Sequence, residues 1–201
     1  RAARLGPGVA VRCLRAQDWA GMNADPTPEV DHADLVASLL SLAVWGSPRG
    51  EGMALPTPLP QDRVAAAEEE LRDLGAVDAE GRITARGRHL ATFPLDPRLA
   101  RALTDGAAII GSRRCAEIAA MLGLEDGQVD FVGQWRQLRS GRHPEAAMWR
   151  READRLARLI NDVPPTDITD DDAVATVVSL ARPGWIARSR GVGSTSYLLA
   201  C

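Results

Sequence analysis

The chain has 201 residues, of which 45% are hydrophobic and 25% charged, a composition typical of a globular protein of one or two domains. All 24 basic residues are arginine, and 27 acidic residues bring the formal net charge to -3, which excludes a uniformly basic nucleic-acid-binding protein. No apolar run approaches the roughly 18 residues of a membrane span, and no signal peptide is visible. The 3 cysteines, odd in number and far apart, favour a reducing cytoplasm.

The first half of the chain is predicted to contain a strand, three helices and a hairpin. Residues Gly8–Leu14 alternate between apolar and polar side chains, as in a strand. Helix Ala33–Trp45 is apolar on two faces and should be buried, whereas helix Gln61–Leu74 is amphipathic. A hairpin over Ala76–Thr84 and a helix from about Thr84 to Ala91 follow. The order helix, helix, hairpin, helix resembles a winged-helix module, with the hairpin as its wing.

The second half is predicted to be a series of helices that ends in two strands. Asp96 is expected to cap the first helix, with Pro97 at its first position, where no backbone N–H is needed. Ser112 and Asp170 are expected to cap two further helices. The remaining elements are two helices, and two strands around a glycine-rich turn: Gln134–Arg139, Glu145–Ile160, Trp185–Arg188 and Ser196–Ala200.

Charge runs along the chain in blocks. Residues 17–81 carry a net charge of -10, residues 82–114 carry +5, and residues 134–158 carry +4. The stretch 182–201 has three arginines and no acidic residue. Basic blocks of this kind can line a nucleic-acid channel, although solvated helix faces that pair with one another would produce the same pattern.

The familiar catalytic motifs are missing from the sequence. His32, His89 and His143 lie far apart and have no cysteine or histidine at zinc-ligand spacing, so no metal site is predicted. A Walker A loop requires a lysine, and the chain has none. By that route the chain alone cannot hold a nucleoside triphosphate.

The N-terminus carries two arginines at a suggestive spacing. Arg1-Ala-Ala-Arg4, followed by Leu-Gly-Pro-Gly, resembles the second half of helicase motif VI, which reads Q-R-x-G-R-x-G-R in DEAH-box helicases. Ala3 departs from the usual glycine. The resemblance implies that Arg1 and Arg4 reach the γ-phosphate of ATP, a role that suits the planar guanidinium fork.

Downstream motifs follow in the order found in the C-terminal half of DEAH-box RNA helicases of the bacterial HrpB type. Thr27–Val30 resembles the T-P-E-I segment, and Leu74–Thr84 resembles the family's wing. Leu90–Ala100 resembles the P-L-x-P-R-L-A entry into the helical ratchet domain. Leu138–His143 and Ala181–Gly191 also fit this branch. The resemblance covers nearly all of the chain.

The resemblance implies a mainly α fold with four parts. These are the end of the second RecA-like lobe, a winged helix, a helical ratchet (helicase-associated HA2) domain and the start of an OB-like β region, expected at residues 1–24, 25–94, 95–181 and 182–201. The chain is therefore expected to be a fragment of a longer protein, because the Walker A and DExH motifs and most of both RecA-like lobes belong upstream.

The resemblance also implies a function, that of an ATP-dependent RNA helicase in which ATP and Mg²⁺ bind to the parent protein. The fragment alone is expected to bind neither and to be inactive. Its expected partners are single-stranded RNA, with DNA as an alternative, and the RecA-like lobes of the same protein, and no membrane. Candidates for the basic lining of the RNA channel are Arg113, Arg114, Arg188 and Arg190.

Two other functions stay open at this stage. A stand-alone winged-helix regulator with a helical effector domain would use Gln61–Leu74 as its recognition helix, but five acids and two arginines give that helix a net charge of -3, which repels DNA phosphates. A helical protein-interaction module would account for the helices but not for the order of the motifs.

Overall fold

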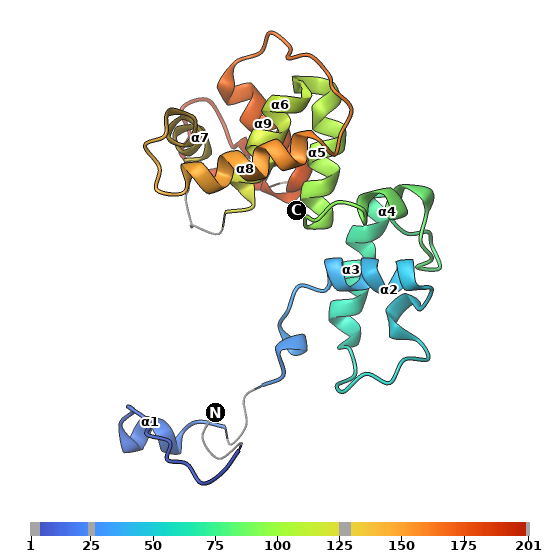
Figure 1. The fold of residues 1–201 in the computed structure, drawn as a ribbon, viewed down its shortest axis with the longest axis vertical. Coiled ribbons are helices and arrows are strands. Elements are labelled where there is room, and N and C mark those ends of the chain that lie inside the picture. Colours follow the sequence, from blue (N-terminus) through green and yellow to red (C-terminus); the bar gives the residue numbers. More distant parts are fainter. Residues whose placement is uncertain (1–4, 24–26, 125–129, 200–201) are drawn as a thin grey trace.

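The structure is a computed structural model that describes residues 5–23, 27–124 and 130–199. The described chain is mainly helical and forms two groups of helices, with an extended segment before them and a small hairpin after them (Figure 1). Across the described ranges, no helix is both long and apolar enough to cross a membrane.

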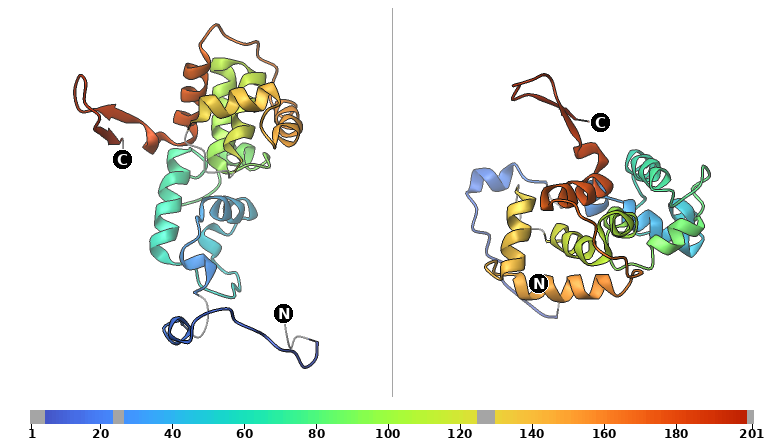
Figure 2. Two further views of the ribbon diagram at one scale, coloured as in Figure 1. Left: turned by 90° about the vertical axis from the view of Figure 1, so that its left-hand side faces the viewer. Right: turned by 90° about the horizontal axis from the view of Figure 1, so that it is seen from above.

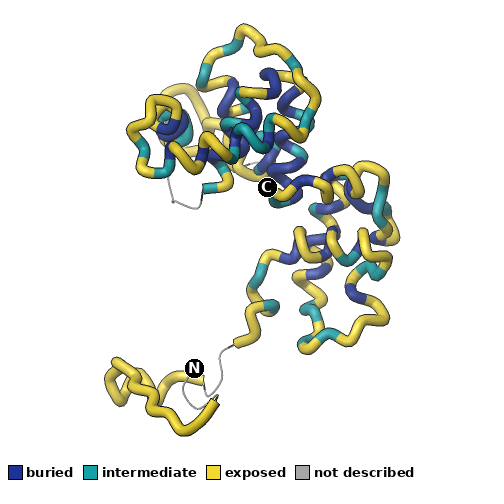
Figure 3. The backbone as a smooth tube through the Cα atoms, viewed as in Figure 1, coloured by how far each residue is buried: buried dark blue, intermediate teal, exposed yellow. Residues whose placement is uncertain are grey.

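The segment 5–23 lies apart from both helical groups (Figure 1) and is exposed along its whole length (Figure 3). The strand predicted over Gly8–Leu14 is wrong, since these residues are irregular and the side chains of Val9 and Val11 are almost fully exposed. A strand needs a neighbour to complete its backbone hydrogen bonds, and no described segment pairs with this one. A short helix, α1 (Ala16–Ala20), ends the segment.

The first helical group has three helices and two short 3-10 turns. They are η1 (Glu29–Asp31), α2 (Val36–Trp45), η2 (Pro48–Gly50), α3 (Gln61–Asp73) and α4 (Ala85–Leu90). Helix α2 begins three residues later than the predicted Ala33, because the Asp34 carboxylate accepts the backbone N–H of Val36 at 3.0 Å and forms a turn. The predicted burial of this helix holds for one face, while Val44 and Trp45 are exposed.

The predicted hairpin is present between α3 and α4. Val77 and Ile83 form an antiparallel bridge, and Gly81 turns the chain with a φ of 79°, in the left-handed region that favours glycine. Thr84 ends the hairpin and caps α4, because its hydroxyl accepts the backbone N–H of Gly87 at 2.9 Å. The hairpin and α4 are thus joined by a single residue.

The second helical group is a bundle of five helices. They are α5 (Pro97–Ile110), α6 (Ser112–Leu122), α7 (Phe131–Ser140), α8 (Ala146–Ala157) and α9 (Asp170–Ala181). Helix α6 packs between α5 and α8, and α9 packs along α5 (Figures 1 and 2). The largest fully buried side chains of the bundle come from all five of these helices: Leu103, Ile110, Ile118, Met121, Trp135, Leu138, Trp149, Leu156 and Val177.

The helix caps of the bundle agree with the sequence at one point and differ at two. Asp96 caps α5 as predicted, since its carboxylate accepts the N–H of Arg98 at 2.9 Å and Pro97 occupies the first position. Ser112 and Asp170 are not caps but the first residues of their helices. The cap of α9 is Thr169, and Ser112 instead uses its hydroxyl in a long-range contact with the loop after α8.

The end of the described chain is a short turn, η3 (Pro183–Trp185), followed by a two-stranded antiparallel hairpin of β1 (Ala187–Ser189) and β2 (Tyr197–Leu199). Both strands agree with the prediction to within two residues at each end. The hairpin stands away from the bundle (Figure 2), and every residue of its strands is exposed.

Candidate nucleic-acid interface

Two of the four predicted channel arginines lie on the exposed hairpin. Arg188 is in β1, and the backbone N–H of Arg190, just past the strand, bonds to the Ser196 carbonyl oxygen at 3.0 Å. Arg188 lies within the strand and Arg190 in the bend that follows it, and both side chains are exposed. Neither forms an ion pair with any described residue.

The other two predicted arginines are bound within the bundle. Arg113 pairs with Glu117 at 2.9 Å and with Asp154 of α8. The hydrogen bonds to both carboxylates raise the pKa of Arg113 and fix its charge. Arg114 donates to the carbonyl oxygen of Ile168 and to the carboxylate of Asp170, both at 3.0 Å. These two guanidinium groups therefore tie α6 to α8 and α9.

Charged side chains also gather around the indole of Trp135 in the bundle. The guanidinium carbon of Arg139 lies 4.8 Å from its ring centroid, within the range of a cation–π contact. The indole N–H donates to Glu117 at 3.2 Å, and Arg139 also lies 3.6 Å from Asp170. The arginines of α6 and α7 thus pair with acids of the same bundle, so part of the positive charge seen in the sequence is neutralised there.

The arginines that resemble motif VI, Arg1 and Arg4, lie outside the described residues. Their expected contact with a γ-phosphate therefore stays a prediction. Among the described residues, no three His, Cys, Asp or Glu side chains gather in a way that could hold a metal ion.

Arg98 is a buried arginine whose role the sequence did not reveal. Its side chain is only 7% exposed, yet it reaches three carboxylates. It bonds to both oxygens of Glu70 on α3, to Asp34 at 2.8 Å and to Asp96 at 3.2 Å. Because α5 belongs to the bundle and α3 to the first helical group, this side chain joins the two groups. The signal available in the sequence was its position in the first turn of a helix, directly after the capping Asp96 and Pro97.

The contact with Arg98 influences the pKa of the Asp34 carboxyl group. Its partial burial favours the neutral acid, but hydrogen bonds from the Val36 N–H and the Arg98 guanidinium outweigh that effect. The net result is a pKa below the ordinary value of the carboxyl group. The ionised form of Asp34 is therefore part of the folded junction between the two helical groups.

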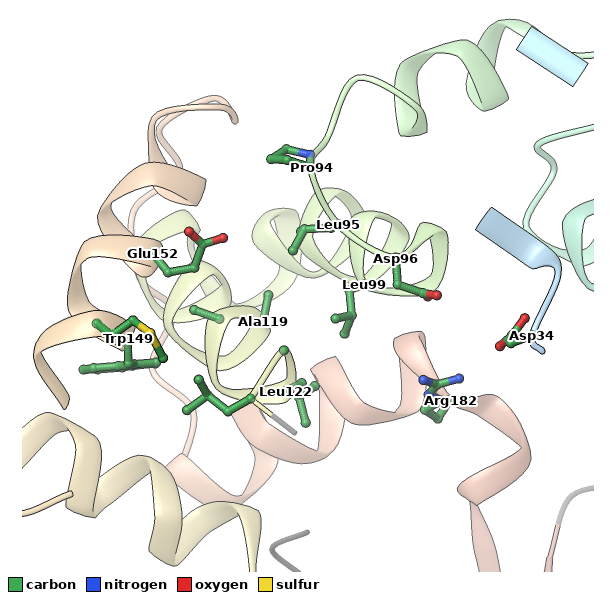
Figure 4. Close-up of a pocket in the computed structure, with 14 residues that line it drawn as sticks. Asp34, Pro94, Leu95, Asp96, Leu99, Ala119, Leu122, Trp149, Glu152 and Arg182 are labelled. Carbon is green, nitrogen blue, oxygen red and sulfur yellow. The ribbon is translucent and has the colours of Figure 1, made fainter. Parts of the chain in front are cut away.

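A hollow of about 660 Å³ lies beside this junction, between the loop that enters α5 and helices α6 and α8 (Figure 4). Leu95, Leu99 and Trp149 provide apolar lining, and Glu152 and Arg182 lie on opposite sides of it (Figure 4). Glu152 is paired with Arg155. No buried side-chain nitrogen or oxygen among the described residues lacks a hydrogen-bond partner, so no orphaned polar group there calls for a ligand.

Comparison with known proteins relates both the fold and the motifs to helicases. Residues 67–95, which include the hairpin and α4, match the family model of the helicase-associated domain (HA2), winged-helix. The ATP-dependent RNA helicase HrpB of Escherichia coli is 28% identical over an alignment of 197 residues that covers 95% of this chain and 23% of that protein. The pre-mRNA-splicing factor ATP-dependent RNA helicase prp22 of Schizosaccharomyces pombe is 31% identical over 125 residues, 62% of this chain and 11% of that protein.

Solved structures give the same result. The crystal structure of the E. coli DExH-box NTPase HrpB matches 98% of this chain with a TM-score of 0.70 and 26% identity. A second structure, of the E. coli DEAH/RHA helicase HrpB, matches with a TM-score of 0.69 and 25% identity. The chain spans about a quarter of the length of these proteins, 23% and 24%.

The fold and the matched segment define a mainly helical chain with a helicase-associated winged-helix domain. More particularly, the chain is similar to the HrpB-type DEAH helicases over nearly its whole length, and its structure matches their C-terminal region. The resemblance drawn from the motif order is thereby confirmed.

Proposed function

We propose that the chain is the C-terminal part of an ATP-dependent RNA helicase, where it helps to couple ATP hydrolysis on RecA-like lobes to movement along single-stranded RNA. One observation carries the proposal: a match to HrpB covers 95% of the chain. We assign residues 1–24 to the end of the second RecA-like lobe, 25–94 to the winged helix, 95–181 to the ratchet bundle and 182–201 to the start of the OB-like region.

In this proposal the two helical groups act as one stiff body. Arg98 links α5 to α3 through Glu70, and Asp34 and Asp96 hold the same guanidinium from two more directions. A movement imposed on the winged helix would therefore pass to the bundle instead of being lost in a flexible joint. The bundle would in turn carry the hairpin to and from the RNA.

In this proposal RNA contacts the β1–β2 hairpin that follows the bundle. Arg188 and Arg190 are exposed and unpaired within the described chain, so they can neutralise phosphates without first breaking an ion pair. Arg113 and Arg114 would have to give up carboxylate partners to do so. We therefore rank the hairpin pair first as RNA ligands, and the α6 pair second.

ATP and Mg²⁺ are proposed for the parent protein only. The chain has no lysine for a Walker A loop, and the two motif VI candidates, Arg1 and Arg4, would assist a triphosphate held elsewhere in that protein. Such a helicase would work in the cytoplasm. The chain has 3 cysteines, an odd number, and Cys13 and Cys115 form no disulfide, which agrees with a reducing compartment.

The alternative of a winged-helix DNA regulator receives less support. Of the acids on α3, Asp62, Glu69 and Asp73 are exposed, while Glu68 and Glu70 are held by arginines. A recognition helix with this surface would repel phosphates. The HrpB match also extends far beyond the winged helix.

The proposal is tested by fluorescence anisotropy with a labelled 12-nucleotide single-stranded RNA, measured across a series of salt concentrations. We expect binding whose logarithm falls linearly with the logarithm of salt concentration, and no ATP turnover by the 201-residue chain with or without RNA. A duplex DNA of the same length serves as the comparison. Tight, sequence-dependent DNA binding, or clear ATP hydrolysis by the chain alone, would overturn the proposal.

A further inference from the structure

The stretch 182–199 combines positive charge with exposed aromatic rings. It holds three arginines and no acid, and it exposes Trp185 by 57% and Tyr197 by 61%. Aromatic residues make up only 4% of the chain, and the two fully buried tryptophans, Trp135 and Trp149, belong to the bundle core. Large exposed rings in an arginine-rich, acid-free setting are typical of surfaces that bind single-stranded nucleic acid.

The ring of Trp185 is held in a defined orientation. Phe131, at the start of α7, lies nearly parallel to it, with an interplanar angle of 8° and ring centroids 6.3 Å apart. The guanidinium carbon of Arg182, at the end of α9, lies 5.8 Å from the same indole centroid. Two helices of the bundle thus position an indole that stays more than half exposed. Such a ring is preorganised, so stacking of a ligand on it costs little additional side-chain entropy.

The arginines of the stretch 182–199 are not held in ion pairs within the described chain, although the charge of Arg182 contributes to the lowered pKa of Asp34. Arg182, Arg188 and Arg190 form no ion pair with any described residue. The arginines of α6 behave differently, since Arg113 and Arg114 each hold a carboxylate. Positive charge therefore remains available in the stretch that contains Trp185, where it could neutralise a phosphate backbone.

We propose that Trp185 is a stacking platform for one nucleobase of single-stranded RNA, with Arg182, Arg188 and Arg190 as the ligands of the neighbouring phosphates. This inference rests on the proposed function, because it names the residues that grip the RNA. The platform is expected to be tolerant of sequence, since every base offers a π face to an indole. Arg182 contributes in a second way, because its cation–π contact holds the ring in place.

An exposed indole could instead be covered by another protein segment, since Ile186 and Leu198 of the same stretch are also exposed. The two possibilities differ in what they require of the side chain. Stacking requires an aromatic face, whereas covering by protein requires only an apolar surface. A leucine in place of the tryptophan keeps the apolar surface and removes the π system.

The test compares single substitutions in the 201-residue chain by anisotropy with labelled 12-nucleotide oligouridylate and oligoadenylate. We expect Trp185→Leu and Trp185→Ala to weaken binding of both by about 5- to 100-fold, and Trp185→Phe to stay within about threefold of the wild type. The salt slope should not change in these variants. Arg188→Ala should instead reduce the slope by about 0.7, as expected for the loss of one phosphate contact. Trp45→Ala, at a tryptophan that is 80% exposed on α2, is the matched control and should bind like the wild type.

The outcomes separate the inference from the proposed function. Wild-type binding with an unchanged Trp185→Leu variant would overturn the stacking platform and leave the proposed function standing. Absence of RNA binding by the wild type would overturn both. Thermal unfolding of each variant serves as the folding control. A direct readout is tryptophan fluorescence, because RNA should quench the wild type more than Trp185→Phe, and equal quenching would contradict the stacking.

Discussion

Arg98 of α5 donates hydrogen bonds from Nε and Nη2 to the two carboxylate oxygens of Glu70 on α3, in the paired geometry that a guanidinium fork allows. The guanidinium is buried, whereas the carboxylate is 37% exposed. The arginine is therefore the group that depends on the pair, because it has been removed from water and needs its acceptors. This contact crosses from the helical bundle to the winged-helix group.

Glu70→Gln should weaken the junction. The amide keeps the shape but offers only one acceptor and no charge, so the Arg98 fork loses half of its partner. We expect the free energy of unfolding to fall by about 1–2 kcal/mol, an amount discounted for the partial exposure of Glu70. Urea unfolding measures it, and Glu69→Gln, at the exposed neighbour, should stay within about 0.5 kcal/mol of wild type. Equal stability of the two variants would show that the fork contributes nothing.

The junction should also respond to acid through Asp34. The folded pKa of this carboxyl lies below its ordinary value, so its ionised form stabilises the fold at pH values above the unfolded pKa of about 4. That contribution is lost as the pH falls through the lower folded pKa. Between about pH 5 and pH 3 the wild type should lose stability more steeply than Asp34→Asn. Asp73→Asn, at an exposed site with no ion-pair partner among the described residues, should follow the wild-type curve. If Asp34→Asn also ran parallel to the wild type, the ionic account of the junction would be wrong.

Gly87 permits the close approach of α4 to the wing hairpin. A Cβ at this position would lie 2.0 Å from the carbonyl oxygen of Ala76, a backbone atom that also accepts hydrogen bonds from Thr84. Gly87→Ala should therefore cost about 3 kcal/mol, since the backbone has to shift. Differential scanning calorimetry checks this, with Gly123→Ala, where the nearest atom is 3.5 Å away, as the tolerated control. A stable Gly87→Ala variant would mean that the packing of α4 on the hairpin is looser than described.

Ser112 fastens the loop after α8 to the start of α6. Its hydroxyl donates to the Asn161 carbonyl oxygen and accepts the Val163 N–H, both at 2.6 Å, and the residue is 3% exposed. Ser112→Ala would leave both backbone groups without this partner, at a cost of about 2 kcal/mol. Hydrogen exchange should become faster at Val163. Ser38→Ala, on the exposed face of α2, should leave exchange unchanged, and identical behaviour of the two variants would refute the fastening role.

Local signals predicted much of the fold. The hairpin over Ala76–Thr84 and the start of α5 were found because glycine, threonine, aspartate and proline act through their own backbone. The assignment of Ser112 as a cap failed for the opposite reason, since its hydroxyl bonds to residues about 50 positions away. Period-2 alternation over Gly8–Leu14 failed because a strand depends on a neighbour that no local pattern describes.

The candidate site could be predicted only in part, because its arginines differ in their tertiary contacts. Arg113, Arg114, Arg188 and Arg190 look alike in the sequence, as arginines in basic stretches. Their difference is tertiary: Asp154 and Asp170, the acids that hold Arg113 and Arg114, lie 41 and 56 residues further along the chain. The proposed platform at Trp185 could not be predicted from the sequence either, because the exposure of an indole depends on tertiary packing. An acid-free stretch with a tryptophan was the only signal available.

The most direct test of the account is to locate bound RNA on the chain. Single-stranded RNA that carries 4-thiouridine would be cross-linked to the 201-residue chain by ultraviolet light, and the modified peptides identified by mass spectrometry. The account predicts adducts within residues 182–199, with Trp185 or Tyr197 among the modified residues. Adducts confined to α3 and its hairpin, or to the α6 segment that contains Arg113 and Arg114, would contradict it.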